Sequence, residues 1–357
     1  MGKQVLSLYL LPFYFPLLLG SVFPKAKGLL VFVGFFLILL IGFKGDVDKD
    51  YVNYEYLYNS VPPIMDGYSA FAASVKELNI EAGFLLLVSM LKAFELGLSA
   101  VFFVVGAIST GLLYYCSKKL NGNMFLIFAF LYSVSFIGLW VQIRYGLASV
   151  ALLAAFILFS EKKYIIAILW VLVSMLFHGL GSIAFVVIAV FFCIDKIRLK
   201  KSQIAVLIAF VAVCLSLLEP RGVLVDAMGL LNDRYSDYAY DIEGSRLSFY
   251  ARMVLFLVLV NLIQLGLVRD RMGVMLLTMV VLSLLAWSVA WSIGILYRVG
   301  TFLEMGYSLF LLRGYYASGR NYVLAVILLV VLSTWRIYIA VGELSNYQPF
   351  LPLFLFE

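Results

Sequence analysis

The sequence predicts an all-α, polytopic integral membrane protein. Of its 357 residues, 64% are hydrophobic and only 13% are charged, and the mean hydropathy is +1.06. Apolar stretches follow one another along the chain, separated mostly by short basic pairs. A composition of this kind excludes a soluble globular domain, so we expect a single transmembrane domain over residues 1–357.

About twelve apolar segments are expected to form transmembrane helices, several of them short. They lie at residues 5–23, 28–43, 98–117, 122–140, 146–160, 164–177, 180–194, 203–218, 251–268, 273–293, 299–313 and 321–341. The first segment could be taken for a signal peptide. It is long, however, no small-residue cleavage site follows it, and Lys25 and Lys27 outweigh Lys3, which favours a first span with its N-terminus outside.

Basic residues orient these helices. Alternating the segments places the following on the cytoplasmic side: Lys25/Lys27, Lys118/Lys119, Lys162/Lys163, the 196–201 cluster, Arg269/Arg271 and Arg313/Arg320. Two long polar loops, 44–80 and 219–250, fall on the extracytoplasmic side and hold most of the aspartates and glutamates. The net charge of +6 therefore reflects topology, and no basic patch with interleaved aromatics suggests nucleic acid as a partner.

The segment from 80 to 97 is apolar enough to span but does not fit this alternation. A span there would reverse every later assignment, and the segment contains Glu81, Lys92 and Glu95. We interpret it as a re-entrant or interfacial helix on the outer side. A thirteenth span is the alternative.

The sole histidine, His178, interrupts an uncharged apolar run from 164 to 194. As one helix this run would be about 46 Å long, against a hydrocarbon core of about 30 Å. Basic residues flank both ends, so we predict a helical hairpin that turns at His178, with arms of about 21 Å that do not cross fully. The imidazole is then either a general base or a group that satisfies freed backbone at the break.

Two arginines lie at the outer boundary of predicted helices, Arg144 after 122–140 and Arg298 before 299–313. A guanidinium at the edge of hydrocarbon costs several kcal/mol unless it is paired or hydrated. Arginine also matches phosphate oxygens with a two-pronged donor set that is always charged. The sequence therefore favours anion binding, with interfacial snorkelling as the alternative.

The first polar loop carries an acidic cluster that includes Asp48 and Asp50. Its spacing is similar to that of a calcium loop, but Tyr51 replaces the required glycine and Leu57 the required glutamate. We therefore expect no metal site. These aspartates are either acceptor-orienting or basic groups, or a solvated acidic face. The three cysteines have no metal-ligand spacing and predict neither a zinc site nor a disulfide framework.

Tyrosines accompany acidic residues in both polar loops. The second loop contains Arg234, Tyr235 and Tyr238 among three aspartates. Flat apolar faces beside carboxylates suit a groove for sugars, whereas the aromatic belt of a membrane interface explains the same residues without a ligand. Composition leaves both interpretations open.

These residues, in this order, resemble the Wzy-type polysaccharide polymerases, in particular their exopolysaccharide (EpsG-like) branch. The resemblance rests on the sequences around Asp50–Tyr54, Glu81–Phe84, Ile143–Ala148 and Phe177–His178, and on the Arg234…Tyr238 loop. It covers about residues 25–185. Three departures are Lys44 in place of an arginine, Tyr145 in place of a glutamine, and the absence of a serine beside His178.

The resemblance implies a glycosyltransferase that joins polyprenyl-diphosphate-linked repeat units into O-antigen, capsule or exopolysaccharide at the outer face of the bacterial plasma membrane. It implies catalytic roles for His178, Arg144, Arg298, Asp50 and Glu81, and substrate binding by Tyr51, Tyr54, Tyr145, Arg234, Tyr235, Tyr238, Arg252 and Tyr297. No obligatory cofactor is expected. The expected partners are the lipid-linked glycans, the bilayer and a chain-length regulator protein.

Two other functions compete with polymerisation. Another multispan glycosyltransferase, or the ligase that transfers finished glycan to a lipid core, would use the same leaving group on the same side. A glycolipid flippase is the rival of a different class. Transporters place their sites near the midplane and often show repeated halves, whereas the unusual polar residues of this sequence gather at the outer rim and no repeat is visible.

Overall fold

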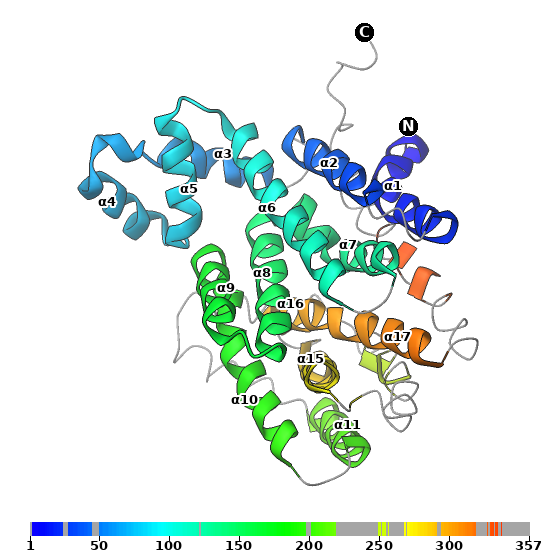
Figure 1. The fold of residues 1–357 in the computed structure, drawn as a ribbon. Coiled ribbons are helices and arrows are strands. Elements are labelled where there is room, and N and C mark those ends of the chain that lie inside the picture. The colour runs from blue at the N-terminus through cyan, green and yellow to red at the C-terminus, as the bar shows by residue number, and fades with distance from the viewer. Residues whose placement is uncertain are drawn as a thin grey trace. The chain divides into compact units, whose positions relative to one another are not determined.

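The computed structural model describes residues 2–23, 28–44, 50–120, 123–197, 201–218, 270–290 and 294–318, with shorter pieces between 249 and 268 and between 327 and 337. Within these residues every regular element is a helix (Figure 1), which confirms the all-α class. Contacts divide the chain into two compact units. The first comprises Met1–Ser182 with Leu328–Glu357, and the second comprises Ile183–Ile327.

The first unit is built around α8 (Ile143–Ser160). Every residue of α8 from Tyr145 to Ser160 is buried, because the helix packs against three neighbours (Figure 1). These neighbours are α6 (Leu98–Lys119), α7 (Met124–Trp140) and α9 (Tyr164–Phe177). Farther from α8, α1 (Gly2–Val22) packs on α7, and α2 (Leu29–Gly42) packs on α6.

Helices α7 and α8 approach each other through a pair of glycines. A Cβ atom on Gly146 would lie 2.1 Å from the carbonyl oxygen of Gly138, so a side chain at this position cannot be accommodated. Small residues allow this kind of close backbone contact between membrane helices. The contact fixes the first turn of α8, which carries Arg144.

The polar segment between α2 and α6 is largely helical where it is described, and is not an irregular loop. It contains α3 (Tyr51–Ser60), the 3-10 helix η1 (Ile64–Asp66), α4 (Tyr68–Leu78) and α5 (Ala82–Ala93). Apolar residues at helical spacing explain the difference: Tyr54 and Leu57 share one face of α3 and are buried. Asn79 ends α4 in the left-handed conformation, with φ of 49°.

Helix α5 corresponds to the segment that did not fit the predicted alternation. It has 12 residues, which is about 18 Å and well short of the about 30 Å of a hydrocarbon core. Helix α2, which the sequence predicts to span, has 14 residues and is only slightly longer. The re-entrant or interfacial interpretation of residues 80–97 therefore stays a prediction.

The helical run is interrupted at His178, as the sequence predicts. Helix α9 ends at Phe177, His178 is extended (φ −162°, ψ 139°), and η2 (Gly179–Ser182) leads into α10 (Ile183–Lys196). Both α9 and α10 have 14 residues, which matches the predicted arms. The boundary between the two units falls after Ser182, so the folding back of the arms stays a prediction.

The second unit is organised around α15 (Arg271–Ala290), which contacts α10, α11 (Lys201–Leu218), α16 (Gly294–Leu303) and α17 (Met305–Ser318). The prediction of one continuous helix at 299–313 is wrong. The structure has two helices with Glu304 between them, and the first begins at Gly294. The interruption falls at Glu304, whose buried carboxylate is paired with Arg252.

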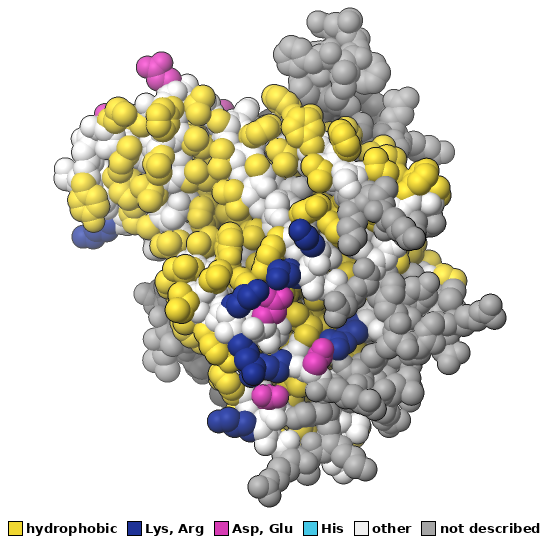
Figure 2. Space-filling model, in the orientation of Figure 1, with side chains coloured by type: hydrophobic (Ala, Val, Ile, Leu, Met, Phe, Trp, Pro, Cys, Tyr) yellow, Lys and Arg dark blue, Asp and Glu magenta, His cyan; other side chains and the backbone are white. Residues whose placement is uncertain are grey.

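Four segments of the described chain are long and apolar enough to cross a membrane: Leu98–Lys119, Ile143–Ser160, Gly179–Lys196 and Arg271–Ala290. Shorter apolar helices accompany them. Hydrophobic side chains cover much of the visible surface over α5 and α6, where Leu86, Met90 and Phe103 are exposed (Figure 2). The protein is therefore membrane-embedded. The count of twelve spans stays a prediction, since most of 251–268 and 321–341 lies outside the described residues.

Candidate functional site

An ion pair between Arg144 and Glu81 forms the centre of the candidate site in the first unit. Arg144 Nη1 lies 2.6 Å from Glu81 Oε2, and the two side chains are 18% and 20% exposed. The other carboxylate oxygen, Oε1, accepts a hydrogen bond of 3.0 Å from the backbone N–H of Gly179. One carboxylate therefore connects the start of α8 to the helix break that follows α9.

Backbone contacts explain why these elements meet. Glu81 immediately precedes α5, and a Cβ atom on Gly83 would lie 2.6 Å from the carbonyl oxygen of Leu176. Helix α5 therefore packs closely against the last turn of α9. Ser174, also in that part of α9, donates a hydrogen bond of 2.9 Å to the Ala148 carbonyl of α8. The three helices are thus tied together next to the ion pair.

His178 is half-buried beside this pair. Its Nδ1 accepts a hydrogen bond of 3.0 Å from the backbone N–H of Leu180. Its ring meets the ring of Tyr145 edge to face, with centroids 5.7 Å apart. An Nδ1 atom that accepts a hydrogen bond carries no proton, so the neutral imidazole has its proton on Nε2.

An aromatic layer lies under the Arg144 guanidinium. Arg144 is placed over the Phe84 ring, 5.6 Å from its centroid, and Tyr54 packs against both Phe84 and Phe102. Tyr54 is only 4% exposed. Burial raises the pKa of the Tyr54 phenol, while the Arg144 charge acts in the opposite direction. The phenol therefore stays neutral at ordinary pH, and its hydroxyl lies within hydrogen-bonding reach of Arg144.

Lys44 is a second cation in this region, and sequence reasoning did not select it as a site residue. It is 2% exposed, and its Nζ donates a hydrogen bond of 2.7 Å to the carbonyl of Trp140, the last residue of α7. Its ammonium also lies 4.5 Å from the Phe102 ring centroid and 5.6 Å from that of Tyr54. The available signal was a lysine directly at the end of an uncharged apolar segment.

Most of the predicted site residues in the N-terminal half lie in this region. Asp50 directly precedes α3 and is half-buried, and its charge acts on Tyr54. The Tyr51 ring lies 5.8 Å from that of Phe102. The first unit thus holds Asp50, Tyr51, Tyr54, Glu81, Arg144, Tyr145 and His178. The resemblance selected these residues, and the packing of α3, α5, α8 and α9 places them near one another.

The second unit contains a separate polar cluster, also built on a paired arginine. Arg252 Nε bonds the Glu304 carboxylate, and the guanidinium stacks 3.4 Å from the Trp287 ring centroid. The Tyr297 ring meets Trp287 edge to face at 5.0 Å. Sequence reasoning selected Arg252 and Tyr297 but missed Trp287 and Glu304. The signal for Glu304 was present, because it is the sole acidic residue in the apolar segment 299–313.

The remaining predicted residues are not brought to either cluster by a described contact. Arg298 lies on α16 beside Tyr297, and its side chain is half-buried in the second unit. Its predicted action together with Arg144 stays a prediction. Arg234, Tyr235 and Tyr238 lie outside the described residues.

Comparison with known families identifies the chain at the level of the family. The model of the EpsG family matches residues 27–355. The chain belongs to the EpsG family. This confirms the resemblance inferred from the motifs and extends it beyond the N-terminal half. No curated protein and no solved structure matches the chain.

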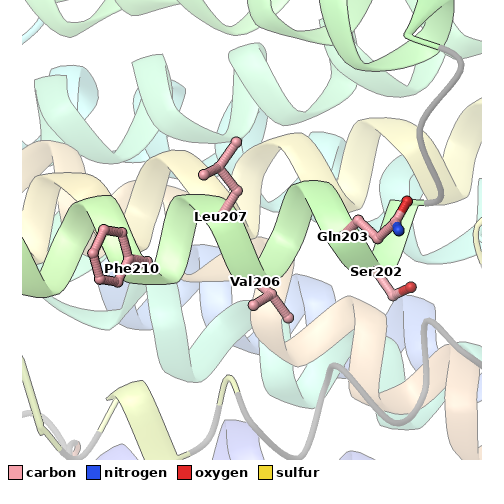
Figure 3. Close-up of a pocket in the computed structure, with 5 residues that line it drawn as sticks. All are labelled: Ser202, Gln203, Val206, Leu207 and Phe210. Carbon is pink, nitrogen blue, oxygen red and sulfur yellow. The ribbon is translucent and has the colours of Figure 1, made fainter.

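Two further features of this EpsG-family protein bear on where chemistry can occur. Within the described residues, no group of three His, Cys, Asp or Glu side chains is placed to hold a metal ion. A surface hollow lies along α11 (Figure 3) and is lined by Ser202, Gln203, Val206, Leu207 and Phe210. Its lining comes from one helix and has no ionisable side chain, so it offers no acid, base or charged ligand.

Proposed function

We propose that this EpsG-family protein polymerises polyprenyl-diphosphate-linked oligosaccharide repeat units into a surface polysaccharide at the outer face of the bacterial plasma membrane. The observation that carries the proposal is the partly buried Arg144 guanidinium, held 2.6 Å from Glu81 beside a helix break with an imidazole. A fixed cation in a partly dry environment is what a departing diphosphate requires.

The proposed reaction is transfer of the growing glycan from its lipid diphosphate to the incoming unit. A hydroxyl oxygen of the incoming unit attacks the anomeric carbon, and a new carbon–oxygen bond forms. The bond between that carbon and the diphosphate oxygen breaks, and its electron pair leaves with the lipid diphosphate. The hydroxyl proton passes to a base. The enzyme must therefore stabilise a leaving anion, orient one hydroxyl and supply a base.

The contacts suggest distinct roles for the three ionisable groups. Arg144 binds the diphosphate. His178 orients the acceptor hydroxyl through its Nε2 proton, because Nδ1 already accepts the Leu180 N–H. Asp50, a half-buried carboxylate whose charge acts on Tyr54, is the base. This assignment replaces the expected role of His178 as base with one that its tautomer supports.

The other selected residues are assigned to substrate binding. Tyr51 is half-buried and provides an aromatic face and a hydroxyl for sugars. Tyr54 and Tyr145 are buried and stay assigned to the substrate by the family resemblance. Arg252, Tyr297 and Arg298 of the second unit stay assigned to the substrate by the family resemblance. Arginines can neutralise the leaving diphosphate without an ion, so the proposal needs no cofactor. A chain-length regulator is proposed as a protein partner.

Deletion of the gene distinguishes this function from its rivals. Loss of a polymerase leaves single repeat units on the lipid carrier or core, which a polysaccharide gel shows as the collapse of a ladder to one band. Loss of a ligase leaves no glycan on the core, and loss of a flippase strands the repeat unit inside. A ladder that survives deletion contradicts the proposal.

Arg144→Gln tests the residue that carries the proposal. We expect at least about a hundredfold loss of long polymer, because the neutral amide cannot stabilise the leaving diphosphate. Arg313→Gln is the matched control, since it removes a guanidinium that is also ion-paired, 2.7 Å from Asp270. Both variants are compared on the gel at equal membrane abundance. Full-length polymer with Arg144→Gln would overturn the assigned role.

A further inference from the structure

We infer that the Glu81 carboxylate occupies the position of a substrate phosphate, and that the diphosphate of the lipid-linked glycan displaces it. The inference rests on the proposed role of Arg144 as the diphosphate ligand. It makes Glu81 an internal competitor for the site and the backbone N–H of Gly179 a second hydrogen-bond donor to the phosphate. It also links substrate binding to the helix break at His178.

The groups around Glu81 are those that bind phosphate. Its two oxygens are divided between a guanidinium, 2.6 Å away at Arg144, and a backbone N–H, 3.0 Å away at Gly179. Arginine side chains and backbone N–H groups are common partners of phosphate oxygens in proteins. A carboxylate and a phosphate therefore compete for the same donors.

One hydrogen-bond donor of the Arg144 guanidinium has no acceptor at this site. Arg144 Nε is buried and makes no hydrogen bond in the described structure. Buried N–H groups are normally paired, and a carboxylate that divides its oxygens between Nη1 and Gly179 does not reach this one. A diphosphate brings more acceptor oxygens than a carboxylate, so it can satisfy Nε as well.

A purely structural role explains Glu81 less well. Helix α5 already packs on α9 through Gly83, whose Cα faces the Leu176 carbonyl. Ser89 of α5 adds a hydrogen bond of 2.7 Å to the Pro62 carbonyl. These contacts hold α5 in place without the carboxylate. The Glu81 side chain is thus able to leave Arg144 while its helix remains docked.

Displacement of Glu81 has a consequence for His178. Gly179 follows His178 directly, and its N–H is held by Glu81 Oε1. The next N–H, that of Leu180, holds His178 Nδ1. When the diphosphate takes Arg144, the contact between α5 and this break is released. Through the single Glu81 carboxylate, binding of the donor diphosphate is therefore coupled to His178, the group that orients the acceptor.

Binding of inorganic pyrophosphate to the purified full-length protein in detergent tests the inference. Calorimetry should show that Glu81→Gln binds pyrophosphate at least about fivefold more tightly than the wild type, because an uncharged amide competes less well. Arg144→Gln should lose about tenfold or more in affinity. Glu161→Gln should bind as the wild type does, since that carboxylate is paired elsewhere, with Lys119 and Lys163.

The outcomes separate this inference from the proposed function. Unchanged or weaker binding by a folded Glu81→Gln protein overturns the inference, as does the absence of binding by every variant. Should Glu81→Gln fail to fold, Glu81→Asp replaces it; its shorter side chain cannot reach both donors, and tighter binding is again expected. Tighter binding in a protein whose deletion leaves the polysaccharide ladder intact would keep the anion site and refute the polymerase.

Discussion

Lys44 shows how a single buried charge can organise the residues around a site. Its ammonium is 2% exposed and bonds the Trp140 carbonyl at the end of α7, where the helix provides no partner for that oxygen. Phe102 and Tyr54 surround the charge with aromatic faces. The lysine therefore caps α7 two residues before Gln142, the residue that precedes α8 and Arg144.

Replacing Lys44 tests this capping role. Lys44→Met should destabilise the folded protein by about 1–3 kcal/mol, because the buried Trp140 carbonyl loses the charged donor at 2.7 Å. Lys44→Gln keeps a donor without the charge and should recover part of the loss. The measurement is the thermal unfolding midpoint in detergent. Lys76→Met, at an exposed position on α4, is the control. Equal midpoints for Lys44→Met and Lys76→Met would contradict the capping role.

At the level of residues, the sequence selected residues that the structure places near one another, but it did not predict their contacts. Arg144 and Glu81 are 63 positions apart, and Glu81 and Gly179 are 98 apart. Their contact depends on the docking of α5 against α9, and that docking depends on a glycine whose close approach has no signature in a single sequence. Lys44 could be noticed as a lysine directly at the end of an uncharged apolar segment, but the sequence gives no signal for its acceptor, a backbone carbonyl.

Among the elements, the crossing of α7 and α8 is the most tightly constrained. Gly146→Ala should destabilise the protein, because the new Cβ would lie 2.1 Å from the Gly138 carbonyl oxygen. The expected cost is about 1–3 kcal/mol, as for overpacking of a filled core. The unfolding midpoint measures it. Loss of polymer should accompany the change, since Gly146 lies in the same turn of α8 as Arg144.

A second glycine provides the control for this prediction. Gly111 lies within α6, and a Cβ atom there would meet nothing within 4 Å. Gly111→Ala should therefore leave the protein as stable or slightly more stable, by up to about 1 kcal/mol, since alanine favours helix over glycine. An equal loss of stability from both substitutions would show that the packing of α7 on α8 is looser than the structure indicates.

Hydropathy located the helices well where charges bracket them. The segment 164–177 matches α9 at both ends, since Lys163 and His178 interrupt the apolar run there. The start of α8 was placed three residues late, at 146 and not 143. An apolar segment ends at a charged residue such as Arg144, whereas the helical hydrogen bonding continues through it. The same limitation hid the division between α16 and α17, because one buried carboxylate hardly changes an apolar average.

For the whole molecule, the orientation in the membrane is a prediction from charge sorting and is open to direct measurement. In a variant without Cys116, Cys193 and Cys214, a cysteine at the exposed position 162 should react with impermeant reagents from the cytoplasmic side only. A cysteine at the exposed Tyr68 should react from the opposite side. Labelling of residue 162 from outside would overturn the predicted topology and with it the placement of Arg144 at the outer face.

The two-unit organisation is the part of the architecture that the sequence did not reveal. Composition is uniformly apolar across the boundary after Ser182, and no linker or change in charge marks it. Each unit nevertheless has its own arginine–glutamate pair, Arg144 with Glu81 and Arg252 with Glu304. Buried pairs of this kind arise from three-dimensional packing, so the spacing of charged residues along the chain does not show which residues pair in which unit.

The burial of Lys44 also has a consequence for biosynthesis. Its carbonyl partner, Trp140, is 96 residues further along the chain, which at common translation rates is about 5–20 s of synthesis. During that interval this carbonyl cannot accept a hydrogen bond from the ammonium, and a charge is costly in hydrocarbon unless its donors are satisfied. The end of α2 therefore reaches its final place only after α7 has been made, so Lys44 imposes an order of assembly on the growing chain.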